Sequence, residues 1–239
     1  MTIPRVRSLL ALLTTLAASV CAVRADDLPI TVIAKPGRLL VSEEFSKPLP
    51  PPEGSTAQFA SGFHGWRCNV VERGGWWNVI DGAFRGMENP EAHHPATASI
   101  GFDFKDVVIQ CEVRMHDVPL DGRRSRFFMV RTTDAKDYVC SIILNESGWR
   151  IQKDDNDHAG PDVAVPLGEI KTPIKLGEWQ KVVFEILGDE VVGTVNGQSL
   201  RGRHPLIGSQ KKSVMFVAGV EGSVRNLKVW EATAKQQGG

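Results

Sequence analysis

Short strand-like segments fill almost the whole chain after residue 38, and they limit what it can fold into. Residues 109–116 show this best, because they alternate strictly between apolar and polar side chains. The apolar members are Ile109, Cys111, Val113 and Met115. A period of two is typical of a strand with one buried face. No helix of ten residues is predicted, so we expect an all-β protein of two packed antiparallel sheets.

Turn residues divide these segments at short intervals. Asp81-Gly82 is the strongest hairpin signal, because a type I′ turn needs positive φ at both of its central positions. Gly188-Asp189 and Asn196-Gly197 predict further tight turns, and the prolines of residues 47–54 predict a stiff surface loop. The expected strands are residues 39–45, 76–80, 83–87, 98–104, 107–117, 125–131, 138–144, 148–153, 179–187, 190–196, 213–219 and 223–230.

The N-terminal residues have the features of an export signal. Arg5 and Arg7 precede residues 8–20, an uncharged and mostly apolar run, and a small residue stands before the expected cleavage after residue 25. The run is too short to span a bilayer, which takes about 20 residues. We therefore expect an exported protein, periplasmic or extracellular, without a membrane span. Lipidation at Cys21 and a buried N-terminal helix are the alternatives.

The domain organisation follows from these features. We expect a signal peptide at 1–25, a linker at 26–38, one β-sandwich domain at 39–231 and a disordered tail at 232–239. Removing the signal peptide takes away three arginines and no acidic residue, so the formal charge falls from 0 to −3. A mildly acidic chain without a dense Lys/Arg patch gives no electrostatic basis for binding nucleic acid. The oligomeric state is left open.

Three cysteines remain after the expected cleavage, namely Cys68, Cys111 and Cys140. An odd number allows at most one internal disulfide, so the fold does not depend on a disulfide framework. A bridge between Cys111 and Cys140 can form if their strands are neighbours. The equal alternative is three buried thiols that act as small hydrophobic side chains.

Five stretches resemble the 3-keto-disaccharide hydrolase domain family, whose members share the fold of concanavalin A-type lectins and glucanases. They are WWNVIDGAFRG (76–86), FDFKDVVIQCEVRM (102–115), FFMVR (127–131), LGEWQKVVFEILGDEVVGTVNG (176–197) and VRNLKVW (224–230). The resemblance implies a concanavalin A-like jelly-roll sandwich and a hydrolase of 3-keto-glycosides or disaccharides. Two departures put that activity in doubt: Val139 replaces an acidic residue of the family, and residues 122–125 replace its Asn-Ser-Gly.

The polar face of residues 110–116 is the first candidate for a binding site. Its members alternate along one predicted strand and are Gln110, Glu112, Arg114 and His116. A sugar needs fixed donors and acceptors together with an aromatic platform. Neighbouring strands would add Arg131, Tyr138 and Trp149. The competing interpretation is that this face meets only bulk water, as one side of an antiparallel sheet often does.

Catalysis on a 3-keto sugar sets its own requirements. A ketone at C3 acidifies the proton at C2, so one base and one oxyanion-stabilising cation would expel the leaving group at C1. Glu112 or His116 is the candidate base, and Arg131 or Arg114 is the candidate cation. Ordinary glycoside hydrolysis needs two carboxylates at a set separation, and the strand pattern that laminarinase-type glucanases use for this is absent.

Two clusters have the composition of cation sites. The first is the loop group Glu91, His93 and His94, which is more typical of solvated surface residues. The second is Asp154, Asp155 and Asp157, which lacks the glycine and glutamate of an EF-hand loop. Motifs for a serine nucleophile, a zinc protease or a phosphate loop are also missing. We expect neither a metal nor a cofactor.

Six tryptophans are candidate sugar platforms, although most are expected in the core. Trp76 and Trp77 are adjacent in one predicted strand, so one of them must leave the core. The sequence thus predicts a carbohydrate-active protein with a saccharide or glycoside ligand. The alternative is a non-catalytic recognition module of the lectin or laminin-G type, and a structural envelope protein without a ligand is the third hypothesis.

Overall fold

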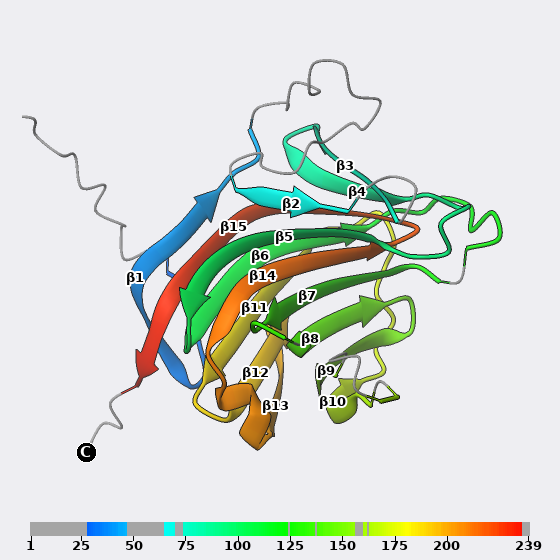
Figure 1. Cartoon of the computed structure of the whole chain (residues 1–239). Coiled ribbons are helices and arrows are strands. Elements are labelled where there is room, and N and C mark those ends of the chain that lie inside the picture. The colour runs from blue at the N-terminus through cyan, green and yellow to red at the C-terminus, as the bar shows by residue number, and fades with distance from the viewer. Residues whose placement is uncertain are drawn as a thin grey trace, which may run out of the picture.

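The computed structural model describes residues 28–46, 65–69, 74–123, 125–136, 138–155, 160–161 and 163–235. Within these residues the chain forms two antiparallel sheets and one short 3₁₀ helix, η3 (Pro205–Gly208), as Figure 1 shows. No helix in this part of the chain has the length and apolar character needed to cross a membrane. The signal peptide expected at residues 1–25 lies outside the described residues.

Sheet A is the larger sheet, and in the described part of the chain it has eight strands. Their order is β13-β12-β11-β6-β15-β4-β3, and β1 pairs with β15 beside this path. The bounds are β1 (Ala34–Glu43), β3 (Gly75–Ile80), β4 (Ala83–Glu88), β6 (Val107–Met115), β11 (Gln180–Leu187), β12 (Glu190–Val195), β13 (Gln198–Arg203) and β15 (Glu221–Ala234). The long strand β15 pairs with β6, β4 and β1. It therefore connects the half of the sheet formed by β13, β12, β11 and β6 to the half formed by β4 and β3.

Sheet B packs face to face with sheet A and has seven strands among the described residues. Their order is β10-β9-β8-β7-β14-β5-β2. The bounds are β2 (Trp66–Cys68), β5 (Ala96–Phe104), β7 (Phe127–Thr133), β8 (Tyr138–Asn145), β9 (Gly148–Lys153), β10 (Val165–Ile170) and β14 (Lys211–Gly219). The prediction of an all-β, two-sheet antiparallel sandwich is confirmed.

The strands that the sequence did not predict are the short or peripheral ones. β2 has three residues, and both β10 and β13 lie at sheet edges with few buried side chains. Such strands show little hydrophobic alternation, which is the main signal for a strand. β1 begins at Ala34, within the stretch expected as a linker, and β15 ends at Ala234, within the expected tail.

The core lies between the two sheets, and the alternation of β6 is the predicted one. Its apolar side chains point inward and are at most 1% exposed: Ile109, Cys111, Val113 and Met115. The structure also shows which of the two adjacent tryptophans enters the core. Trp77 is 0% exposed and its ring packs against Phe84 and Phe128, whereas Trp76 is half-buried on the outer face.

Cys68, Cys111 and Cys140 are free thiols. Cys111 lies on β6 of sheet A and Cys140 on β8 of sheet B, so the condition for a bridge between neighbouring strands is not met. Burial raises the pKa of Cys68 and of Cys140 to about 12, and it also raises the pKa of Cys111. These thiols therefore stay protonated and pack as small hydrophobic side chains.

The two sheets lie close together where Gly193 of β12 faces sheet B. A Cβ at this position would lie 2.6 Å from Ile151 Cγ2 and 2.9 Å from Ile142 Cδ1. We expect G193A to lower the free energy of unfolding by about 1–3 kcal/mol through overpacking. Urea denaturation measures this change.

The matched control is G101A, because the nearest atom to a Cβ on Gly101 of β5 is Lys212 O at 3.8 Å. We expect this variant to change stability by less than about 0.5 kcal/mol. Equal losses in the two variants would contradict the tight approach of the sheets at Gly193.

Candidate functional site

The structure separates the predicted site residues instead of bringing them together. Glu112 and the other polar residues of β6 project from the outer face of sheet A, whereas Arg131 and Tyr138 belong to sheet B. Outward side chains of two packed sheets point away from each other. The prediction of one shared site is therefore wrong, and the pairing of Glu112 or His116 with Arg131 cannot form.

Trp149 needs a correction of its own. It was expected to be a sugar platform, but it is 2% exposed and belongs to the core between the sheets. Strand β9 begins at Gly148, so the side chain of Trp149 points inward and that of Arg150 points outward. Trp149 is among the residues that line a small hollow of about 200 Å³, together with Pro173 and Gln198.

The outer face of sheet B carries an apolar strip, which we define as Phe127, Met129, Ile143, Met215 and Val217. Met129, Ile143 and Val217 stand side by side on β7, β8 and β14, and they are only 9%, 4% and 3% exposed. Phe127 and Met215 are partly buried and pack against them. The accessible apolar surface of the strip therefore comes mainly from Phe127 and Met215.

A hollow of about 540 Å³ opens over Phe127, Met129 and Ile143. We call it the sheet B hollow. Polar side chains surround its apolar floor: Ser125, Arg126, Asn145, Glu146, Ser147 and Arg150. An apolar floor with a few polar groups around it is the usual composition of a site for a small ligand.

Arg131 stands beside the strip and is held in place by Asp154. Its Nε and Nη2 atoms donate to the two carboxylate oxygens at 3.1 and 3.2 Å, and its guanidinium lies 4.1 Å from the centre of the Tyr138 ring. Asp154 is 2% exposed and also accepts hydrogen bonds from Ser141 at 3.0 Å and from Gln152 at 2.6 Å. A fork-to-carboxylate pair of this kind fixes the orientation of the guanidinium.

The same network reaches the sheet B hollow through Gln152. In register, Arg131, Ser141 and Gln152 stand side by side on β7, β8 and β9. The Gln152 side-chain oxygen accepts a hydrogen bond from Arg150 Nε at 2.9 Å, and Arg150 lines the hollow. Two arginines are therefore oriented beside the apolar strip before any ligand arrives.

Sequence reasoning missed the role of Asp154, which it considered only as part of a cluster with the composition of a cation site. The available signal was an acidic residue directly after the alternating strand at residues 148–153, but its partner is 23 residues away in the chain. Asp157 lies outside the described residues. Glu91, His93 and His94 are exposed, and no group of three or more metal-binding side chains converges in the described part of the chain.

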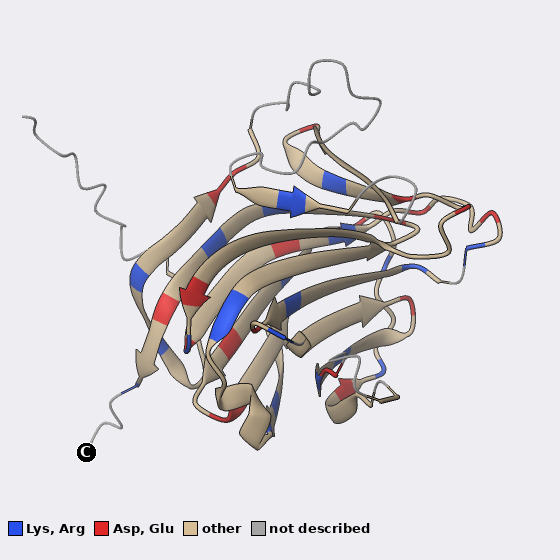
Figure 2. Ribbon diagram, viewed as in Figure 1, with Lys and Arg blue, Asp and Glu red and all other residues tan. Residues whose placement is uncertain are grey.

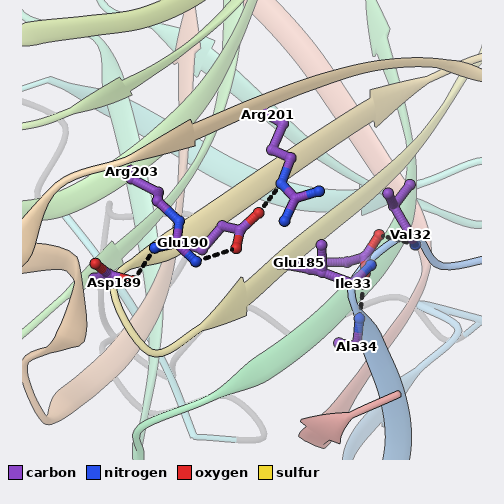
Figure 3. A network of polar contacts seen from close by, with 8 residues as sticks. All are labelled: Val32, Ile33, Ala34, Glu185, Asp189, Glu190, Arg201 and Arg203. Carbon is purple, nitrogen blue, oxygen red and sulfur yellow. Dashed lines mark hydrogen bonds and ion pairs between the residues drawn. The ribbon is translucent and has the colours of Figure 1, made fainter. Parts of the chain in front are cut away.

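The outer face of sheet A holds a second groove of about 640 Å³, whose lining includes Gln110 and Glu112. Residues 28–32 form one of its walls. Figure 3 shows how this segment is attached: the carboxylate of Glu185, which is 0% exposed, accepts hydrogen bonds from three successive backbone N–H groups. The donors are Val32 at 2.7 Å, Ile33 at 2.9 Å and Ala34 at 2.9 Å.

Glu112 is engaged within the protein. Its carboxylate forms an ion pair with Arg225 at 2.6 Å and accepts a hydrogen bond from Asn226 at 3.4 Å. A β-bulge in β15 explains why two successive residues reach the same carboxylate, because the register with β6 shifts between Arg225 and Lys228. Figure 2 shows Lys and Arg residues interspersed with Asp and Glu residues over the ribbon.

His116 lies at the end of β6 in a crowded polar environment. Its Nε2 is 2.8 Å from Ser223 Oγ, and its Nδ1 is 3.6 Å from Glu221, which also pairs with Arg85. Burial lowers the pKa of His116 to about 4, and Arg85 adds to this effect while Glu221 opposes it. The imidazole is therefore neutral at neutral pH.

The comparisons with known proteins support the fold. No family model and no curated protein matches the chain in sequence. The structure is similar to the carbohydrate binding module CBM66 from Bacillus subtilis, at 14% identity and a TM-score of 0.56 over 70% of this chain and 96% of that one. It is also similar to the CBM2 module of the evolved Dit of Lactobacillus casei BL23 phage J-1, at 14% identity and a TM-score of 0.54 over 85% and 99% of the two chains.

A third similar structure is an enzyme, the GlcNAcα1-4Gal releasing endo-β-galactosidase from Clostridium perfringens. The identity is 11% and the TM-score 0.54, over 84% of this chain and 65% of that one. At such identities the similarity shows the fold alone, which is a galectin-like jelly-roll sandwich of the kind found in carbohydrate-binding modules. Membership of the 3-keto-disaccharide hydrolase family stays a hypothesis from the sequence.

The ion pair of Arg131 with Asp154 can be tested through stability. We expect D154N to lower the free energy of unfolding by about 3 kcal/mol, because it leaves a largely buried guanidinium without its counter-charge. The control is E146Q, which removes the more exposed pair of Glu146 with Arg126 and should cost less than about 1 kcal/mol. Equal losses, measured by urea denaturation, would show that Asp154 has no special role.

His116 predicts a pH dependence of stability. Its pKa is about 4 in the folded protein against an ordinary 6.5, so the unfolded chain takes up the proton first as the pH falls. The free energy of unfolding should therefore decrease as the pH drops below about 6.5. The charged and polar groups around the imidazole are Arg85, Arg114, Glu221 and Ser223.

The comparison is between wild type and H116Q, by urea denaturation from about pH 5 to 8. In H116Q the free energy of unfolding should decrease less as the pH falls, because the group that takes up the proton is gone. Parallel curves for the two proteins would contradict the assignment to His116.

Proposed function

We propose that this chain binds a saccharide in the sheet B hollow and does not cleave it. The observation that carries the proposal is the fixed pair of Arg131 and Asp154 next to the apolar strip. A sugar ring presents an apolar C–H face and a rim of hydroxyl groups. The strip would cover the first. Arg150 would bind the second from the lining of the hollow, and Arg131 would bind it from beside the hollow.

The orientation of these donors matters for affinity. Arg131 is held at two points by Asp154, and Arg150 is held by Gln152. A side chain that is already ordered loses less conformational entropy when it binds a ligand. Asn145 and Ser147 add amide and hydroxyl groups at the rim of the hollow.

The state of the carboxylates favours recognition over catalysis at this site. Asp154 is 2% exposed, and its oxygens accept hydrogen bonds from Arg131, Ser141 and Gln152. Glu146, the acidic residue of the hollow's lining, is paired with Arg126 at 2.6 Å. Neither carboxylate is placed to take a proton from a bound sugar.

Hydrolysis of 3-keto-glycosides is the second candidate function, and it concerns the groove on sheet A. There Glu112 lines the groove and Arg225 lies 2.6 Å from its carboxylate, which is a base beside a cation. Incubation with 3-keto-trehalose and with trehalose, followed by product analysis, tests it. Cleavage of only the keto sugar by wild type, and none by E112Q, would favour the enzyme over the recognition module.

Export belongs to the same proposal. Two arginines, the uncharged apolar run at residues 8–20 that follows them, and the expected cleavage after residue 25 favour a periplasmic or extracellular protein. N-terminal sequencing of the protein recovered outside the cytoplasm should begin at Asp26. An uncleaved cytoplasmic product would overturn this part of the proposal.

The saccharide site itself is tested by binding. The full chain would be screened against a panel of neutral and acidic oligosaccharides, and the best ligand measured by calorimetry. We expect F127A and R150A each to weaken binding at least tenfold, which is about 1.4 kcal/mol, because they remove the floor and a rim donor.

The control for these variants is K181A, which changes an exposed residue on the opposite face and should leave the affinity unchanged. Absence of any saccharide ligand, or unchanged affinity in both F127A and R150A, would overturn the proposed site.

A further inference from the structure

A second polar cluster lies on the outer face of sheet A, away from the proposed saccharide site. In register, Arg85, Ser223 and Arg114 stand side by side on β4, β15 and β6. Trp179, which directly precedes β11, lies beside Arg114. The guanidinium carbon of Arg114 is 4.5 Å from the centre of the Trp179 ring, and that of Arg225 is 4.2 Å from it.

The arginines of this cluster differ in their ion pairing. Arg85 is paired with Glu221, and Arg225 is paired with Glu112. Arg114 has no ion pair within the described part of the chain, and its Nε is buried without a hydrogen-bond partner. The carboxylate of Asp81 attracts Arg114 from beyond ion-pair distance, so Arg114 is the cation of this cluster that an incoming anion can pair with directly.

The surroundings of Arg114 act on its charge in both directions. Burial lowers its pKa, and so does repulsion from Arg85 and Arg225, while Asp81 and Glu221 act in the opposite direction. A guanidinium that is partly desolvated and close to two others is stabilised by any anion that approaches it. Arg114 remains half-buried rather than covered, so its outer nitrogens can be reached.

Contact with Trp179 does not explain Arg114 by itself. A cation over an aromatic ring gains only a modest stabilisation. A buried donor without a partner carries a cost of similar size, which offsets much of that gain. Arg225 also contacts the same ring and has Glu112 as its counter-charge.

We infer that Arg114 binds an oxyanion on the outer face of sheet A, with Arg85 and Arg225 adding attraction from either side. A guanidinium binds the two oxygens of a carboxylate, sulfate or phosphate side by side, which is its preferred geometry. The carboxylate of an acidic sugar and a free inorganic oxyanion share this chemistry. Glu112 and Glu221 hold the flanking arginines and leave Arg114 as the anchor.

The test is a titration of the full chain at low salt with glucuronate, glucose and inorganic sulfate. The readouts are the NMR signals of the Arg114 Nε–H and the Trp179 indole N–H. We expect saturable shifts with glucuronate and none with glucose. Saturation with sulfate as well would support an oxyanion site open to inorganic ions, whereas shifts with neither anion would overturn the inference.

Variants separate this site from a general charge effect. R114Q should weaken glucuronate binding at least tenfold. R114K keeps the positive charge but loses the paired N–H donors of the guanidinium, so it should weaken binding less. K181Q removes one exposed cation from the same face and should leave binding unchanged. Equal weakening in R114Q and K181Q would overturn the inference.

A further control distinguishes the anion site on sheet A from the proposed saccharide site on sheet B. F127A changes only the sheet B hollow, so it should leave the anion titration unaltered even if the proposed saccharide function fails. Unchanged NMR signals from the core in R114Q would show that the variant still folds. If R114Q does not fold, R114K with the same titration decides the question.

Discussion

Alternation of side chains across each strand governs both the stability and the functional surfaces of this protein. Every second residue of a central strand such as β6 enters the core, and the residues between them project outward. In a two-sheet sandwich the outward residues of sheets A and B face opposite directions. Polar chemistry from the two sheets therefore cannot meet, and each face has to be considered as a separate site.

The network around Asp154 shows how a sandwich can hold charged groups on a largely apolar face. Taking a carboxylate out of water is costly unless its oxygens are hydrogen-bonded and its charge is paired. Arg131, Ser141 and Gln152 meet both needs from β7, β8 and β9. The result is a rigid set of donors beside the apolar strip, which is an arrangement suited to a ligand with both apolar and hydroxyl surfaces.

Sheet A uses its outer face differently. Glu185 fastens the segment before β1 by accepting three backbone N–H groups, and this attachment helps to build the groove over Gln110 and Glu112. Further along the same face, Arg114 has no direct ion pair among the described residues, whereas the neighbouring Arg85 and Arg225 are both paired. The two faces thus offer different chemistry, with an apolar floor on sheet B and an arginine without an ion pair on sheet A.

Local sequence patterns were enough to predict the long strands, the Asp81-Gly82 turn and the inward face of β6, because strand period and turn geometry depend on neighbouring residues. They also selected Arg131 and Glu112 as chemically interesting. They could not assign these two residues to different sheets, place Trp149 in the core, or reveal Asp154 as the partner of Arg131. Strand order joins segments that are distant in the chain, and only the folded structure brings those segments into contact.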